Sequence, residues 1–229
     1  DDVILPGDRF DIRQQPVFQN QVAPLDLPAS QANQQWGHRN GNPSHSITHP
    51  ALGAQLSPVF VVDIGEGDSS RARITSHPVV AGGVVYTIDA RALVTATTVN
   101  GAQLWQRDLT PSRDGRGDAS GGGLSVAGGK LYVTTGFGEV TALDASTGAV
   151  AWVQDLDAPA QAAPTVRGDL VYVVARDSIA WALDTGNGRI RWQQSGAPST
   201  ANFGSGASPA VSGEFVILPF ASGEVLATY

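Results

Sequence analysis

Residues 128–156 read GGKLYVTTGFGEVTALDASTGAVAWVQDL, and this stretch decides the fold. It contains three short runs, at 131–134, 140–143 and 150–153, that are rich in β-branched or aromatic residues. Glycine, aspartate, serine and threonine bound each run. Alternating apolar and polar residues between such turn-forming residues are typical of β-strands. The stretch therefore predicts three strands joined by short turns.

The same motif returns elsewhere in the chain. Each copy ends in a hexapeptide that begins with a polar residue and a glycine and closes on a tryptophan. The three hexapeptides are NGAQLW (100–105), TGAVAW (147–152) and NGRIRW (187–192). The equivalent aromatic residues in successive copies are Tyr86, Tyr132 and Tyr172, and Trp105, Trp152 and Trp192. The tryptophans lie 47 and 40 residues apart. A strand-only repeat of about 40 to 50 residues is typical of a β-propeller. We therefore predict an all-β propeller of four-stranded antiparallel blades.

The repeats place the propeller portion of the chain at residues 36–229. The expected blades are three complete ones at 74–109, 123–156 and 163–194, and a partial one at 208–229. The last of these stops before its tryptophan motif. With about eight blades in a full ring, we expect the natural polypeptide to be about twice this length. The missing half of the same propeller would then be a partner. The sequence also has no methionine, so we expect a processed or shortened product.

Residues 56–64 (LSPVFVVDI) are predicted to form one isolated strand ahead of the first repeat. Phe60 stands where the fourth strand of each repeat has its tryptophan. A lone fourth strand can complete the last blade of a ring and so remove the open sheet edges.

Residues 1–35 differ from the rest because they are rich in proline and glutamine and their apolar residues follow no period. Such a segment cannot bury enough apolar surface to fold alone. We expect an extended tail or tether, and a segment that docks on a partner is the alternative.

Composition excludes several classes of site. The formal charge is −7, and the basic residues are one lysine, Lys130, and thirteen arginines without a basic patch. Nucleic-acid binding is therefore not expected. The absence of cysteine excludes disulfides, thiolate metal sites and cysteine nucleophiles within these residues. No run of 18 apolar residues is present, so we expect no membrane-spanning segment.

The repeated aromatic residues are expected to be structural. A tryptophan at the same place in every outer strand covers the gap to the neighbouring sheet and buries a large apolar area. Asp144 and Asp184 each follow an Ala-Leu pair, and an aspartate at the start of a turn accepts backbone N–H bonds. We expect turn residues there rather than a catalytic pair.

Two connections and a histidine pair are the remaining candidates. His45 and His49 have the spacing of metal ligands on a helix, but prolines flank them, so a metal site is not expected. The connection at 110–120 is charged, and a solvated loop is the simplest interpretation. The connection at 196–206 is uncharged and has Phe203 at its centre. That side chain is either tucked under the loop or offered to a partner as an anchor.

The segment 128–152 closely resembles the repeat of the PQQ-like β-propeller superfamily. Within it, the chain is most similar to the BamB family of outer-membrane assembly lipoproteins. The similarity covers residues 36–229. It rests on Asp-Ile-Gly at 63–65 and on the openings HPVVAGGVVY and SVAGGKLYV of the first two repeats.

The resemblance implies a non-catalytic, eight-bladed periplasmic scaffold without a cofactor. A lipidated N-terminal cysteine, absent from this sequence, would hold it to the inner leaflet of the outer membrane. Its partners would be the BamA POTRA domains and unfolded outer-membrane proteins. In the family the connection between blades three and four contacts BamA, and this maps onto Ala201, Asn202, Phe203 and Gly204. The family has apolar residues followed by an arginine there. Phe203 keeps the apolar character, whereas Ala201 is small and Gly204 is uncharged.

Two other classes share such blades. A PQQ-dependent dehydrogenase would need a Ca²⁺ site of acidic and amide side chains, a catalytic aspartate and, in many members, vicinal cysteines. The sequence has no cysteine and no prominent acidic cluster. An extracytoplasmic ligand-binding or sensor propeller is the other alternative, and no motif excludes it.

Overall fold

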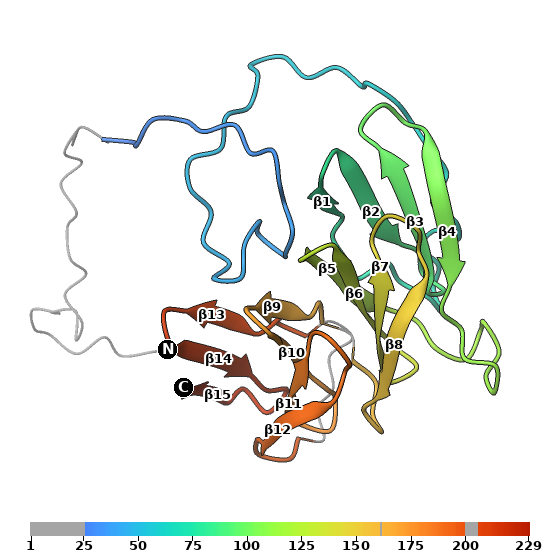
Figure 1. Cartoon of the computed structure of the whole chain (residues 1–229), viewed down its shortest axis with the longest axis vertical. Coiled ribbons are helices and arrows are strands. Elements are labelled where there is room, and N and C mark those ends of the chain that lie inside the picture. The colour runs from blue at the N-terminus through green and yellow to red at the C-terminus, as the bar shows by residue number, and fades with distance from the viewer. Residues whose placement is uncertain (1–25, 161, 200–205) are drawn as a thin grey trace, which may run out of the picture.

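The computed structural model describes residues 26–160, 162–199 and 206–229 (Figure 1). In this part of the chain three four-stranded sheets and one three-stranded sheet follow one another in sequence, and every strand pairing is antiparallel. The sheets stand in an arc, with the first strand of each on the inside and the last on the outside (Figure 1). This arrangement confirms the predicted all-β propeller.

Strand bounds follow the repeats. The first sheet contains β1 (Val79–Ala81), β2 (Val84–Ile88), β3 (Leu93–Thr98) and β4 (Gln103–Asp108). The second contains β5 (Gly122–Ala127), β6 (Lys130–Thr135), β7 (Glu139–Asp144) and β8 (Val150–Asp155). The third contains β9 (Thr165–Arg167), β10 (Leu170–Val174), β11 (Ile179–Asp184) and β12 (Ile190–Ser195). The last contains β13 (Ala210–Ser212), β14 (Phe215–Pro219) and β15 (Val225–Thr228).

The register between the third and fourth strands shifts at the same place in the three complete blades. The shift comes directly after an alanine that pairs with the tryptophan of the repeat; these pairs are Ala96–Trp105, Ala142–Trp152 and Ala182–Trp192. A bulge bends the strand and increases its twist. In each blade, this distortion lies beside the aromatic residue of the outer strand.

Aromatic side chains join each blade to the next. Trp105 donates its indole N–H to the Ala145 carbonyl at 3.1 Å, and the Tyr86 hydroxyl donates to the same carbonyl at 3.1 Å. Gly148 lies against the Trp105 ring with a φ of 69°, and a Cβ there would come within 2.6 Å of the ring. Glycine is therefore required by both its conformation and its neighbour. The same set of contacts recurs one blade further on, among Tyr132, Trp152, Thr185 and Gly188.

Residues 56–64 do not form the predicted strand. A strand needs a neighbouring backbone to bond with, and no strand of the described structure pairs with this segment. Phe60 nevertheless lies against Gly101, where a Cβ would come within 2.9 Å of it. Gly101 is equivalent to Gly148, so Phe60 contacts the first blade as Trp105 contacts the second. Completion of a last blade by this segment stays a prediction.

Part of the predicted N-terminal tail is described. Residues 26–35 are almost entirely exposed, and Gln31 donates its backbone N–H to the His49 carbonyl at 2.9 Å. This segment is therefore attached by backbone contacts to the chain that follows it. Residues 1–25 lie outside the described part.

Candidate functional site

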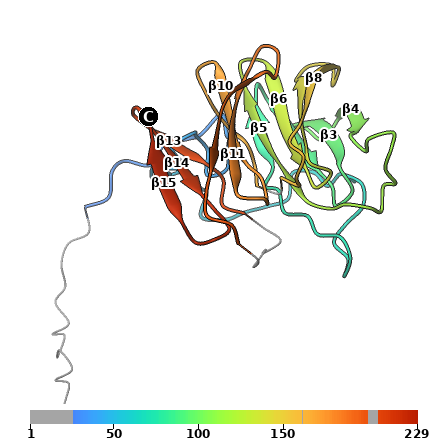
Figure 2. The ribbon, with the colours of Figure 1, turned by 90° about the horizontal axis from the view of Figure 1, so that it is seen from below.

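The propeller has two faces with different loops. Antiparallel strands alternate in direction, so the connections between blades and the turns between second and third strands lie on one face, the lower one in Figure 2. We name it the connection face. Among the described residues it comprises 110–121, 157–160, 162–164, 196–199 and 206–207 and the turns at 89–92, 136–138, 175–178 and 220–224.

The predicted partner-binding residues, Ala201, Asn202, Phe203 and Gly204, lie outside the described residues. On one side of them, Ala197 donates its backbone N–H to the Glu224 carboxylate at 2.7 Å. On the other side, the Gly206 carbonyl accepts a hydrogen bond from the Arg39 guanidinium at 3.3 Å. Side-chain contacts thus fix both ends of this connection.

The charged connection between β4 and β5 is tied to the neighbouring blade. Arg113 lies 3.4 Å from both Glu139 and Asp155, and Arg116 lies 3.2 Å from Asp108. Exposed ion pairs of this kind each contribute about 0–1 kcal/mol. Burial raises the pKa of Glu139, and the adjacent Arg113 opposes that shift. The carboxylates on this part of the face are therefore paired internally.

Asp144 and Asp184 lie at equivalent turns of adjacent blades and make separate local contacts. Asp144 accepts hydrogen bonds from Ser146 and Thr147, which lower its pKa. The pKa of Asp184 is also lowered, chiefly by Arg191, whose guanidinium lies 2.6 Å from it. Each carboxylate thus holds its own turn.

The centre of the arc is crossed by residues 36–43, which we name the hub strap. The innermost strand of every blade has one free edge, and the valine at the same position of each donates its backbone N–H to the hub strap. These bonds are Val80 to the Trp36 carbonyl (2.9 Å), Val126 to the Gly37 carbonyl (2.8 Å), Val166 to His38 Nε2 (3.1 Å) and Val211 to the Pro43 carbonyl (2.8 Å). Because unpaired backbone donors at a buried edge are costly, the hub strap stabilises all four blades together.

His38 is the histidine of the hub strap and is only 5% exposed. Its Nε2 accepts the Val166 N–H, so this nitrogen carries no proton. Burial lowers the pKa of His38 to about 4, and the charge of His45 adds to the effect. The pKa of His45 is also lowered, by burial and by Arg39. His38 is therefore neutral near pH 7.

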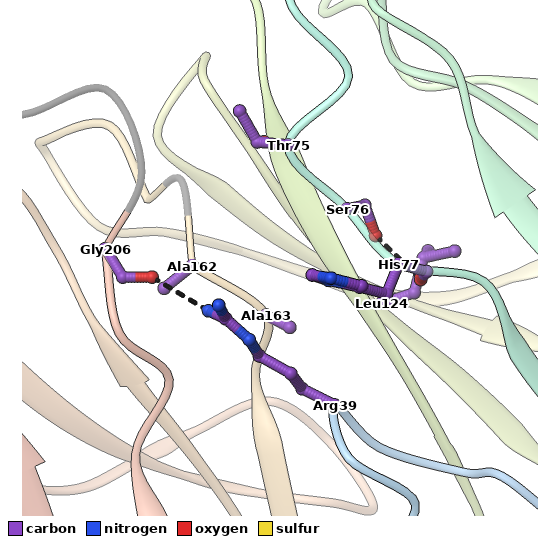
Figure 3. A pocket seen from close by; sticks show the side chains of 8 residues that line it. All are labelled: Arg39, Thr75, Ser76, His77, Leu124, Ala162, Ala163 and Gly206. Atoms are coloured by element: carbon purple, nitrogen blue, oxygen red, sulfur yellow. Dashed lines mark hydrogen bonds between the residues drawn. The ribbon is translucent and has the colours of Figure 1, made fainter.

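The inner end of the arc leaves little space beside the strap. Arg39 extends between the segments that lead into β1, β9 and β13, and the pocket that it lines has a volume of about 10 Å³ (Figure 3). A single water molecule needs about 10–15 Å³. This pocket can therefore hold at most one water molecule.

In the described part of the chain, no helix is long and apolar enough to cross a membrane. Within the same residues, no three histidine, aspartate or glutamate side chains are grouped so that they could hold a metal ion.

A family model described as outer membrane protein assembly factor BamB matches residues 90–228. BamB of Yersinia pestis is 29% identical over 152 residues, which are 62% of this chain and 38% of that protein. The chain thus spans well under half the length of this relative.

Solved structures agree on the fold. BamB from Moraxella catarrhalis superposes with a TM-score of 0.56 and 23% identity, over 71% of this chain and 48% of that one. The quinohemoprotein alcohol dehydrogenase ADHIIG from Pseudomonas putida gives 0.52 and 21%, over 66% of this chain and 29% of that one. At these identities, both matches show the fold alone.

Proposed function

Because this chain belongs to the BamB family of outer membrane protein assembly factors, we propose that it is a non-catalytic scaffold subunit of the outer-membrane β-barrel assembly machinery. It would reside in the periplasm, anchored to the inner leaflet of the outer membrane. It would bind the POTRA domains of BamA and assist the insertion of unfolded outer-membrane proteins. The observation that carries the proposal is the family match, which extends from the first blade to β15.

The architecture supports such a role physically. The hub strap and the interblade tryptophans make the blades one rigid support, and the connection face presents loops on it. A protein interface needs a small buried apolar core with a polar rim. In this proposal Phe203, which is flanked by small residues in the sequence, would be the apolar anchor, and the charged loop at 110–121 would form part of the rim.

Phe203→Ala tests this proposal. We expect the variant to bind the purified periplasmic POTRA region of BamA about 5- to 30-fold more weakly, because an aromatic anchor typically contributes about 1–2 kcal/mol. Calorimetric titration measures the affinity, and a thermal melt should give a nearly unchanged midpoint.

Phe215→Ala is the matched control. Phe215 is 54% exposed and begins β14, immediately after the turn on the opposite face. This variant should leave the affinity unchanged. Equal binding by the wild type and Phe203→Ala would mean that Phe203 is tucked under its loop, and failure of the wild type to bind would reject the scaffold proposal.

The dehydrogenase likeness supplies a second candidate at the level of the fold. A PQQ-dependent dehydrogenase would bind PQQ tightly and only with Ca²⁺, which a fluorescence titration detects. Binding of neither PQQ nor the POTRA region would leave the ligand-binding or sensor propeller as the interpretation.

A further inference from the structure

We propose that a polar hollow on the connection face binds a carboxylate of a protein partner, with Arg71 and Arg176 as the cations that hold it. The hollow has a volume of about 260 Å³, and segments around the first three blades bound it. Its lining includes Gly117 and Asp118 from the β4–β5 connection and Pro159 from the β8–β9 connection. The identity of the partner rests on the proposed function, whereas the carboxylate chemistry rests on the hollow itself.

Backbone contacts hold both arginines in place. Ser69 donates its N–H to the Ala72 carbonyl at 2.7 Å, and Ala72 donates its N–H to Ser69 Oγ at 3.0 Å. Ala72 is fully buried, so this turn keeps Arg71 at an exposed tip. Arg176 lies in the turn between β10 and β11, and its backbone N–H donates to the Pro159 carbonyl at 2.9 Å. The two guanidinium groups therefore come from two well-supported turns that both line the hollow.

Neither guanidinium has an anionic partner in the part of the chain that is described. The arginines that do pair with carboxylates there are Arg73, Arg91, Arg113, Arg116 and Arg191. The Nε atom of Arg176 is buried and has no hydrogen-bond acceptor. A charged group that is partly withdrawn from water is costly when it has no counter-charge. An anion in the hollow would supply a counter-charge to the Arg176 guanidinium, which lines it.

The chemistry of the hollow favours a carboxylate. Its own acid, Asp118, accepts the Gly115 N–H at 2.7 Å and so serves the turn of its loop. Two guanidinium groups against one carboxylate leave the hollow positive on a chain whose formal charge is −7. The planar fork of N–H groups on arginine matches the two oxygens of a carboxylate.

The size of the hollow points to a side chain or a chain terminus. Its volume of about 260 Å³ is smaller than the roughly 300–1,000 Å³ of sites for drug-sized molecules. An acidic side chain and a C-terminal carboxylate share the required chemistry and both fit this space.

Three tripeptides distinguish these two sources of the carboxylate. We expect a tripeptide with a central glutamate and both ends blocked, or one with three glycines and a free C-terminus, to shift the backbone amide signals of Gly117, Gly136 and Arg176 in an NMR titration at low ionic strength. The blocked tripeptide with a central glutamine should cause no shift. Whichever of the two carboxylate peptides binds shows whether the site takes an acidic side chain or a chain terminus. If neither carboxylate peptide binds, or if the glutamine peptide binds equally, the proposal is overturned.

Arg176→Gln should lower, at least fivefold, the affinity for the peptide that binds. Arg71→Gln should lower it by the same factor, and because Arg71 is exposed this replacement leaves the protein interior unchanged. Arg167→Gln is the control, because Arg167 is an exposed arginine beside the turn on the opposite face and its replacement changes the net charge equally. An equal loss in Arg167→Gln would show a general charge effect and overturn the site.

The site and the proposed function can fail separately. Peptide binding without capture of the POTRA region would keep the carboxylate site and reject the BamA partnership. If the protein captures the POTRA region, and neither Arg71→Gln nor Arg176→Gln changes the affinity for the peptide or for the POTRA region, the BamA partnership is kept and the carboxylate site is rejected.

Discussion

Trp152→Ala is expected to lower the free energy of unfolding by about 3–5 kcal/mol, the usual cost of removing a large buried aromatic side chain. Trp152 is only 8% exposed, and its indole N–H donates to the Thr185 carbonyl of the next blade at 3.1 Å. Its ring lies 5.9 Å from that of Tyr132 and against Gly188. Alanine would leave a cavity between two blades and remove one of the hydrogen bonds that the Thr185 carbonyl accepts. Urea unfolding followed by circular dichroism measures the loss.

Trp192→Ala is the matched control for that experiment. Trp192 occupies the same place in the third blade and keeps the contact with its own tyrosine, Tyr172, at 5.9 Å. It is only half-buried, and in the described structure its indole N–H makes no bond like that of Trp152. Its replacement should cost less than half as much. Equal losses at the two positions would show that the interblade contact is not what makes Trp152 important.

The blades could be predicted from the sequence because their signals are local. Alternation and turn residues predicted strands at 131–134, 140–143 and 150–153, and these runs lie within β6, β7 and β8. The first blade was expected to begin at residue 74, whereas its first strand, β1, begins at Val79. Pro78 has no N–H to contribute to a ladder, so the chain joins the sheet only after it.

The hub strap could not be predicted, because its partners are distant in the sequence. Residues 36–52 carry turn-forming residues without a period, and nothing local indicates that Pro43 meets Val211. A usable signal lies in the repeats themselves. Each innermost strand leaves a row of backbone donors that needs acceptors, and no repeat supplies them.

The arginine hollow was hidden for a related reason. Arg71 and Arg176 are more than a hundred residues apart in the sequence, and each lies in a turn with no motif. Only the arc of blades brings their turns to one face, together with Pro159. By contrast, the suggestion that Phe203 anchors a partner came from the composition of its loop and from the family resemblance, and it stays a prediction.

Acid is expected to destabilise the protein by about 3 kcal/mol through His38 alone. Burial lowers the pKa of His38 from 6.5 to about 4. Between these values the unfolded chain binds a proton that the folded chain does not, so stability is lost as the pH falls. The protein keeps this stability in full above pH 6.5 and has lost it in full below pH 4. Each unit of difference in pKa corresponds to about 1.4 kcal/mol.

His38→Gln isolates this contribution, because other groups also titrate in acid. The side-chain oxygen of glutamine lies near the position of Nε2, so it can accept the Val166 N–H and does not titrate, whereas Arg39 and His45 are unchanged. Urea unfolding of both proteins at several pH values between 7.5 and 4 gives the two stability curves. We expect the wild type to lose about 3 kcal/mol more than the variant over this range. Parallel curves would mean that His38 takes up its proton in the folded state, and therefore that the hub strap opens at the third blade without unfolding the rest.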